Sequence, residues 1–289
     1  MNELFDGNAT RRGFFARGAA LTAGAAAASL LLSQSAEAAP TANLGIPTTS
    51  LSLPGSGDTQ VLNYALTLED LEADLYTQAL NRLTTGGNTG TKAAASVGIL
   101  PGAGLNANDK VVQYLSRFAP IEAAHRNFLF DALGNDAITR QVPKKYDFGL
   151  QLITGDTNTV RTAVLNLVLQ AEATGVQAYL GAIPFFSTGS QYLSVAAAIQ
   201  GTEARHTTSL TILRNLLVAG GLDSTDPART PVAPLRGDLG ANPPVQTSAS
   251  HGNEAYVSAT PNQGDSSGID LYRLPTEVVN RVGASIKTA

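Results

Sequence analysis

Four segments of the sequence, each roughly 25 residues long, carry apolar residues at alternating steps of three and four. This spacing predicts amphipathic α-helices that each bury one face. The predicted helices cover residues 58–83, 108–133, 158–183 and 190–219. Glycine or proline follows each segment within a few residues, as is typical where helices end. Helices of about 37 Å favour an all-α fold built as a four-helix bundle.

The connections between the four helical segments differ in length. Residues 84–107 form a long Gly/Ala-rich loop, and residues 134–157 form a second long connection. Residues 184–189 form a short one. We therefore expect two helix pairs joined by one long crossover, which is an established bundle topology.

The N-terminus has the layout of a cleaved export signal in residues 1–38. Arg11 and Arg12 precede an apolar stretch over residues 19–32, and small residues follow it up to Ala38. This arrangement resembles a twin-arginine signal, so we expect cleavage after Ala38 and a periplasmic or extracellular mature protein. The apolar stretch is short and rich in Ala and Gly for a membrane span, which leaves an uncleaved anchor as the alternative. The mature chain contains no other segment of transmembrane length.

The predicted bundle is flanked by irregular sequence on both sides. Residues 39–57 are rich in Pro, Gly, Ser and Thr and are expected to form a linker or an extended arm. The bundle itself is expected to span residues 58–221. Residues 222–289 form an irregular Pro/Gly-rich tail that ends in a short helical pattern, PTEVVNRVGASI. The sequence leaves open whether this tail packs against the bundle.

Composition excludes several classes of function. The net charge of −4 and the absence of a Lys/Arg cluster beyond the N-terminus argue against a nucleic-acid partner. The chain contains no cysteine, which excludes disulfides, zinc–thiolate sites and iron–sulfur clusters.

Acidic and histidine residues interrupt the apolar face near the middle of every predicted helix. These residues are Glu69 and Glu72, Glu122 and His125, Glu172, and Glu203 and His206. Burying so many carboxylates is costly unless cations compensate them, and no Lys or Arg lies on these faces. Two divalent metal ions would neutralise four carboxylates, and the two imidazoles would complete the ligand set.

The spacing of the histidines strengthens this interpretation. Two of the three histidines in the chain, His125 and His206, follow a glutamate by three residues. Residues at i and i+3 share a helix face, so Glu122 could bridge two metals while His125 binds one. Glu203 and His206 repeat the arrangement on the fourth helix.

The first helix offers two candidate acids. Glu172 is followed seven residues later by Tyr179, and Glu69 has the same relation to Tyr76. This match favours Glu69 as the ligand, with Glu72 as an auxiliary or alternative acid. The two tyrosines are predicted to support the ligands, whereas the alternative is that both are core residues with paired hydroxyls.

One Glu on each of two helices, with Glu-x-x-His on each of the other two, resembles the ferritin-like di-metal carboxylate superfamily. The segments LNYALTLEDLEADLY, PIEAAHRNFLFDALG, AEATGVQAYLGA and IQGTEARHTTSLTILRNLL are similar to exported ferritin-like proteins related to plant desiccation-related proteins. The resemblance implies six metal ligands: Glu69, Glu122, His125, Glu172, Glu203 and His206. It also implies that Tyr76 and Tyr179 contact these ligands. Pro120 departs from the pattern and is expected to distort the second helix beside the site.

The resemblance implies two iron or manganese ions, with metal ions and small oxidants as partners. Oxidation of Fe(II), reduction of O2 or peroxide, and peroxide disproportionation all stay open as chemistries, in a stress-protective role. The alternative is a metal-free bundle with a structural role in stress tolerance. Formation of a homo-oligomer also stays open, although the long loops and the proline-rich tail would hinder packing into a closed storage cage.

Overall fold

Four long helices dominate the part of the chain that the computed structural model describes, residues 53–141, 143–218, 220, 273 and 275–288. They are α2 (Asp58–Leu83), α3 (Lys110–Leu133), α5 (Thr157–Ala182) and α6 (Leu193–Val218). The predicted all-α four-helix architecture is therefore confirmed. The predicted signal, most of the predicted linker and residues 222–272 of the tail lie outside the described residues.

Capping side chains define where two of the helices begin. The Asp109 carboxylate accepts hydrogen bonds from the backbone amides of Val111 and Val112 at 2.9 and 3.1 Å. The Asp156 carboxylate accepts one from the amide of Thr159 at 2.7 Å. Both satisfy amides that lack a partner in the first turn of a helix.

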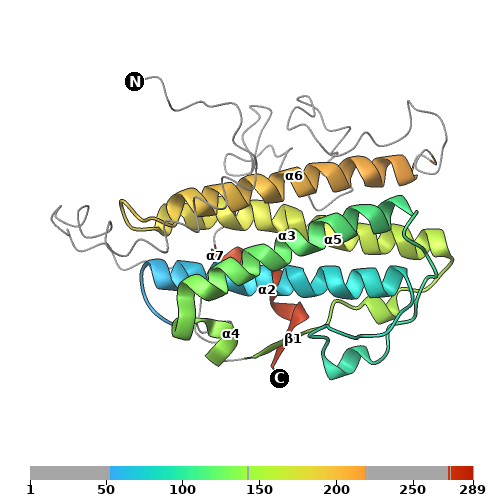
Figure 1. Ribbon diagram of the computed structural model, residues 1–289, viewed down its shortest axis with the longest axis horizontal. Coiled ribbons are helices and arrows are strands. Elements are labelled where there is room, and N and C mark those ends of the chain that lie inside the picture. The colour runs from blue at the N-terminus through green and yellow to red at the C-terminus, as the bar shows by residue number, and fades with distance from the viewer. Residues whose placement is uncertain (1–52, 142, 219, 221–272, 274, 289) are drawn as a thin grey trace, which may run out of the picture. The chain divides into compact units, whose positions relative to one another are not determined.

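The helices form two hairpins, α2 with α3 and α5 with α6, and α2 also packs along α5. The colours in Figure 1 show that α3 and α5 run in the same direction, so the connection between them spans the length of the bundle. This connection is the predicted long crossover. It contains α4 (Ile138–Gln141), the strand β1 (Lys144–Tyr146) and three-residue 3₁₀ turns at either end.

Polar side chains of α2 hold the crossover along its course. The Asn63 side chain donates to the carbonyl of Asp136 at 2.9 Å and accepts from the amide of Ile138 at 2.7 Å. Near the other end of α2, the Arg82 guanidinium donates to the carbonyl of Ile153 at 2.7 Å. Between these points, the hydroxyl of Tyr146 donates to Asp70 at 2.6 Å.

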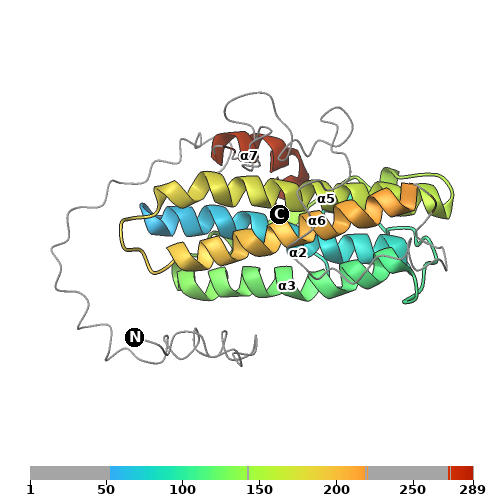
Figure 2. The same ribbon diagram turned by 90° about the horizontal axis from the view of Figure 1, so that it is seen from above.

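The end of the chain docks on the bundle. The helix α7 (Pro275–Val282) packs against α5 (Figure 2). Its residues Val278 and Val279 are buried. The strand β2 (Ile286–Thr288) pairs antiparallel with β1. The expected short terminal helix is thus present, and the described part of the tail is a packed element of the fold. The strand pairing was not expected from the sequence.

Pro120 does not interrupt α3, which stays α-helical from Lys110 to Leu133 without a π-helical turn. Both Pro120 and Ser116, whose carbonyl loses its helical partner, are exposed residues. Water can therefore satisfy that carbonyl on the outer side of the helix.

The apolar core consists of two clusters separated by a polar layer. Along α2, the apolar residues between positions 61 and 68 belong to one cluster and those between 75 and 83 to the other. Residues 69–74, between them, include the buried acids Glu69, Glu72 and Asp74. The layer lies at the middle of the bundle, where all four long helices contribute polar side chains.

Candidate metal centre

The six predicted ligands converge in this polar layer. They come from all four long helices: Glu69, Glu122, His125, Glu172, Glu203 and His206. The four glutamates are fully buried, and His206 is almost so. The His125 side chain keeps 13% of its surface exposed, which makes it the member of the set that solvent reaches most easily.

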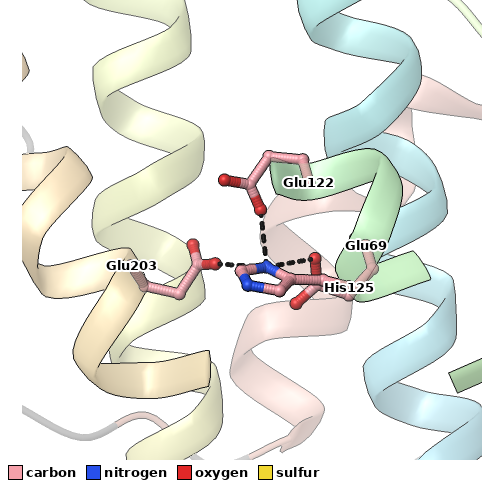
Figure 3. Close-up of side chains that lie close together, drawn as sticks. All are labelled: Glu69, Glu122, His125 and Glu203. Carbon is pink, nitrogen blue, oxygen red and sulfur yellow. Dashed lines mark hydrogen bonds and ion pairs between the residues drawn. The ribbon is translucent and has the colours of Figure 1, made fainter. Parts of the chain in front are cut away.

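The first group of ligand atoms surrounds His125, as Figure 3 shows. Its Nδ1 atom lies 2.9 Å from Glu122 Oε2, 3.4 Å from Glu69 Oε2 and 3.5 Å from Glu203 Oε1. Three helices thus direct carboxylate oxygens at one imidazole nitrogen. One nitrogen can satisfy only one of these oxygens through a hydrogen bond, whereas a metal ion can bind several at once.

The second group surrounds His206 and shares Glu122 with the first. The Nδ1 atom of His206 lies 2.6 Å from Glu122 Oε1 and 3.4 Å from Glu172 Oε2. The 2.6 Å contact lacks the angles of a hydrogen bond, so His206 Nδ1 and Glu122 Oε1 are both without a hydrogen-bond partner among the described residues. Glu122 therefore directs one oxygen into each group.

Tyrosines contact two of the three glutamates that belong to a single group. Tyr179 on α5 donates a 2.6 Å hydrogen bond to Glu69 Oε1 on α2. Tyr76 on α2 donates to Glu172 Oε1 on α5. In both glutamates the second oxygen, Oε2, faces a histidine. The two tyrosines therefore contact the predicted ligands across the α2–α5 interface.

Glu72 lies beside the centre and in neither group. It is buried, and it approaches Glu203 at a point next to Gly175 of α5. On the first helix the structure thus places Glu69 in the cluster and leaves Glu72 as an additional acid at its edge.

The electrostatics of the layer reflect an excess of acids over histidines. Burial raises the pKa of Glu69 and of Glu172. Burial and the charge of a neighbouring glutamate raise the pKa of Glu72 and of Glu203 well above the ordinary value. These four carboxyls gain a proton or a cation more readily than carboxyls in water do.

At Glu122 and the two histidines, interactions with neighbouring charged groups outweigh burial in setting the pKa. Burial alone would raise the pKa of Glu122, but the hydrogen bond with His125 and the close charges of His125 and His206 outweigh it and lower the pKa to about 2. Burial alone would lower the pKa of His206, but Glu172 and Glu122 raise it to about 9. The pKa of His125 is raised in the same way by Glu122, Glu203 and Glu69.

The unpartnered atoms fit a metal site. Among the described residues, five buried glutamate oxygens and one histidine nitrogen of the cluster have no hydrogen-bond partner: Glu69 Oε2, Glu122 Oε1, Glu172 Oε2, both oxygens of Glu203, and His206 Nδ1. Buried polar atoms are almost always paired in folded proteins. Carboxylate and imidazole donors in this combination suit iron and manganese.

Phe118 contacts one of the predicted ligands, whereas the sequence predicted it only as a core residue. Its ring stacks on His206 with a centroid distance of 3.9 Å and an interplanar angle of 17°. Phe118 precedes Glu122 by one helical turn, so its position on the inner face was readable from the sequence. Its contact with His206 on α6 could not be read from the sequence, because that contact joins two helices.

The part of the chain that the structure describes contains no helix that is both long and apolar enough to cross a membrane. A family model described as a ferritin-like domain matches residues 57–217, which is more than half of the chain. Neither curated proteins nor solved structures gave a significant match.

Proposed function

Since the chain belongs to the ferritin-like domain family, we propose that its central cluster binds two redox-active metal ions, iron or manganese, and reacts with O2, peroxide or Fe(II). The observation that carries this proposal is the position of Glu122. It directs one oxygen to the group around His125 and the other to the group around His206. A carboxylate shared in this way suits two adjacent metal ions.

The residues divide into two sets around Glu122. Glu69 and His125, with Glu203, would hold one ion, and Glu172 and His206 would hold the other. Bound iron or manganese would supply electron transfer to or from O2 or peroxide. Five glutamates face only two histidines in this layer, so cations would also neutralise the excess negative charge.

The hydroxyls of Tyr76 and Tyr179 orient two of the ligands. Each holds one oxygen of its glutamate and leaves the other directed at a histidine. Groups that hydrogen-bond metal ligands set their orientation and basicity. Solvent exposure at His125 provides an approach for small oxidants, since the other five residues are almost completely buried.

Export by a twin-arginine route to the periplasm or beyond is part of the proposal. Residues 1–38, which carry the predicted signal, lie outside the described residues, so the proposal rests on the sequence there. Proteins with this class of signal are generally exported in the folded state, which suits a protein that acquires its metal before export. A stress-protective role follows if the reaction consumes oxidants.

A metal-free bundle is the second candidate, and one observation favours it. His125 forms a hydrogen bond to Glu122, and His206 lies against the same carboxylate, so part of the charge is balanced without metal. The unpartnered oxygens of Glu69, Glu172 and Glu203 argue against this candidate.

Metal analysis of protein purified from the exported fraction separates the two. We expect at least about two ions of iron or manganese per chain. A well-folded protein with less than about one ion per chain would contradict the metal proposal. If metal is bound, oxygen evolution from peroxide would indicate a manganese catalase-like reaction. Fe(II)-dependent O2 consumption would indicate an iron oxidase.

A further inference from the structure

The two oxygens of Glu203 face different surroundings. Oε1 lies 3.5 Å from His125 Nδ1 and belongs to the first group of ligand atoms. Oε2 is directed at α5, where a Cβ atom on Gly175 would lie only 2.5 Å from it. Glu122 divides its oxygens between the two groups, whereas Glu203 connects the first group to a location outside both.

Glu72 occupies that location. Its Oε1 atom would lie 3.3 Å from the same Cβ position on Gly175, so the carboxylates of Glu72 and Glu203 converge there. Glu72 is 3% exposed and Glu203 is fully buried. Neither Glu72 Oε2 nor Glu203 Oε2 has a hydrogen-bond partner among the described residues. Two buried carboxylates directed at one point require a cation or a proton between them.

Gly175 creates the space for this pair. Glycine is unfavourable in the middle of a helix, and Gly175 lies well inside α5. Any side chain at this position would collide with the carboxylate of Glu203 and would crowd that of Glu72. Gly201 of α6 offers a contrast, because nothing lies within 4 Å of the corresponding Cβ position there.

A small cavity adjoins the same point. It has a volume of about 20 Å³. Its lining comprises Glu72, Thr174 and Gly175 and the apolar residues Leu68, Leu71, Ala171 and, from α7, Val282. This volume is sufficient for one water molecule or one ion. The cavity therefore leaves room for one water molecule beside Glu72, which supplies the only carboxylate among its lining residues.

We propose that Glu72 and Glu203, across the space left by Gly175, form a third position for a divalent cation beside the two-ion centre. The inference rests on the proposed function, because Glu203 also belongs to the first group. The donors are carboxylate oxygens and water, which suit a hard divalent cation such as Mn²⁺. The cation would be reached from the α2–α5 side of the bundle, under α7.

Counting bound ions tests this proposal. Metal-stripped full-length protein is equilibrated with Mn²⁺ by dialysis, and bound manganese is measured per chain. We expect three ions in the unaltered protein and two in Glu72→Gln, which keeps the shape and removes the charge. Asp131→Asn removes a carboxylate from an exposed site on α3 and should retain three ions.

A second pair of variants tests the space. Gly175→Ala should also lose one of three ions, because the added methyl displaces Glu203 Oε2. Gly201→Ala is the matched control, and it should retain all three ions. Circular dichroism establishes that each variant is folded.

The outcomes separate this inference from the proposed function. Two ions in both the unaltered protein and Glu72→Gln, with equal affinities, would overturn the third position and leave the two-ion centre intact. Loss of all ions in Glu72→Gln would make Glu72 a ligand of the centre itself and would also overturn the third position. Absence of bound manganese and iron from the unaltered protein would overturn the proposed function, and this inference with it.

Discussion

The hydroxyl of Tyr179 on α5 lies 2.6 Å from the carboxylate of Glu69 on α2, and the pair formed by Tyr76 and Glu172 mirrors it with the helices exchanged. The two hydrogen bonds cross the α2–α5 interface in opposite directions. This near-symmetry gives both halves of the centre the same type of support. It also joins the two helices at the level where carboxylates replace apolar side chains.

Replacement of Tyr179 by Phe should therefore affect both stability and metal binding. The change leaves a buried carboxylate oxygen of Glu69 unpaired, at a cost of about 1–3 kcal/mol in the free energy of unfolding. Metal affinity should fall by roughly 10- to 100-fold, because the ligand loses its orienting hydrogen bond. Urea unfolding and a metal titration measure the two effects.

Tyr64→Phe is the matched control for this experiment. Tyr64 is a buried tyrosine of α2 whose hydroxyl has no hydrogen-bond partner among the described residues. Its replacement should leave metal affinity unchanged and should not destabilise the protein. Equal effects of Tyr64→Phe and Tyr179→Phe would contradict the orienting role.

Glu122→Gln should remove metal binding most completely among single changes at the centre. Glu122 contacts both histidines, and the amide replaces one of two metal-facing oxygens by a nitrogen that cannot bind a metal in the same way. We expect less than about one ion per chain, with helix content unchanged. Retention of two ions would show that Glu122 is not shared between them.

Much of the fold and the cluster was predictable because the signals are local. The helix period, the acidic caps and the two Glu-x-x-His pairs each lie within a few turns of one helix. The spacing from Glu69 to Tyr76 favoured Glu69 over Glu72 as the metal ligand, and Glu69 is the acid of the first helix that lies in the cluster. The spacing did not show which glutamate each tyrosine contacts, and in the structure each tyrosine contacts the glutamate of the other helix.

The remaining features depend on contacts between distant segments. The strands β1 and β2 have only three residues each, too few for a period, and almost the whole second half of the chain separates them. Likewise, Gly175 looks like an unfavourable residue within a helix until the carboxylates beside it are known. Neither feature has a signal within its own element.

Phe118 should position His206 through their stacked rings. Phe118→Leu keeps an apolar side chain but removes the aromatic face 3.9 Å from the imidazole. We expect a loss of about 0.5–1.5 kcal/mol in stability from the aromatic pair, together with weaker metal binding. Phe148, which stacks on Tyr146 away from the centre, provides the control. Phe148→Leu should lose similar stability with no change in metal affinity, and the same loss of affinity in both variants would argue against a positioning role.

The stability of the metal-free protein should decrease as pH rises from about 5 to about 9. Burial raises the folded-state pKa of four carboxyls, those of Glu69, Glu72, Glu172 and Glu203, above the ordinary glutamate pKa of 4.5. As pH rises above 4.5, the unfolded chain therefore releases protons that the folded protein retains. The pKa of His206, raised from 6.5 to about 9, adds stability that is complete below 6.5 and is lost as pH approaches 9. The pKa of Glu122, lowered to about 2, acts oppositely, and its contribution is lost as pH falls from 4.5 towards 2.

Bound metal should reverse this trend, because it takes the place of the protons. The stabilisation by saturating Mn²⁺ should therefore increase from about pH 6 to about pH 8. Urea unfolding with chelator and with Mn²⁺, at matched ionic strength, measures both curves. If the metal-free protein instead became more stable across this range, the buried glutamates would be ionised. Their negative charge would then be compensated by groups other than protons or metal ions.

The docking of the chain end should depend on Gly181 of α5. A Cβ atom at this position would lie 1.8 Å from the backbone carbonyl oxygen of Arg273, so Gly181→Ala should displace the segment that leads into α7. Exposure of Val278 and Val279 should then make residues 275–288 sensitive to protease, while the four long helices persist. Limited proteolysis with mass spectrometry detects the cleavage, and Gly201→Ala is again the control because its surroundings are open.

Since Val282 lines the cavity beside Glu72, a released α7 should also speed the exchange of Mn²⁺ at the third position. Faster proteolysis without faster exchange would show that α7 does not control access to that cavity.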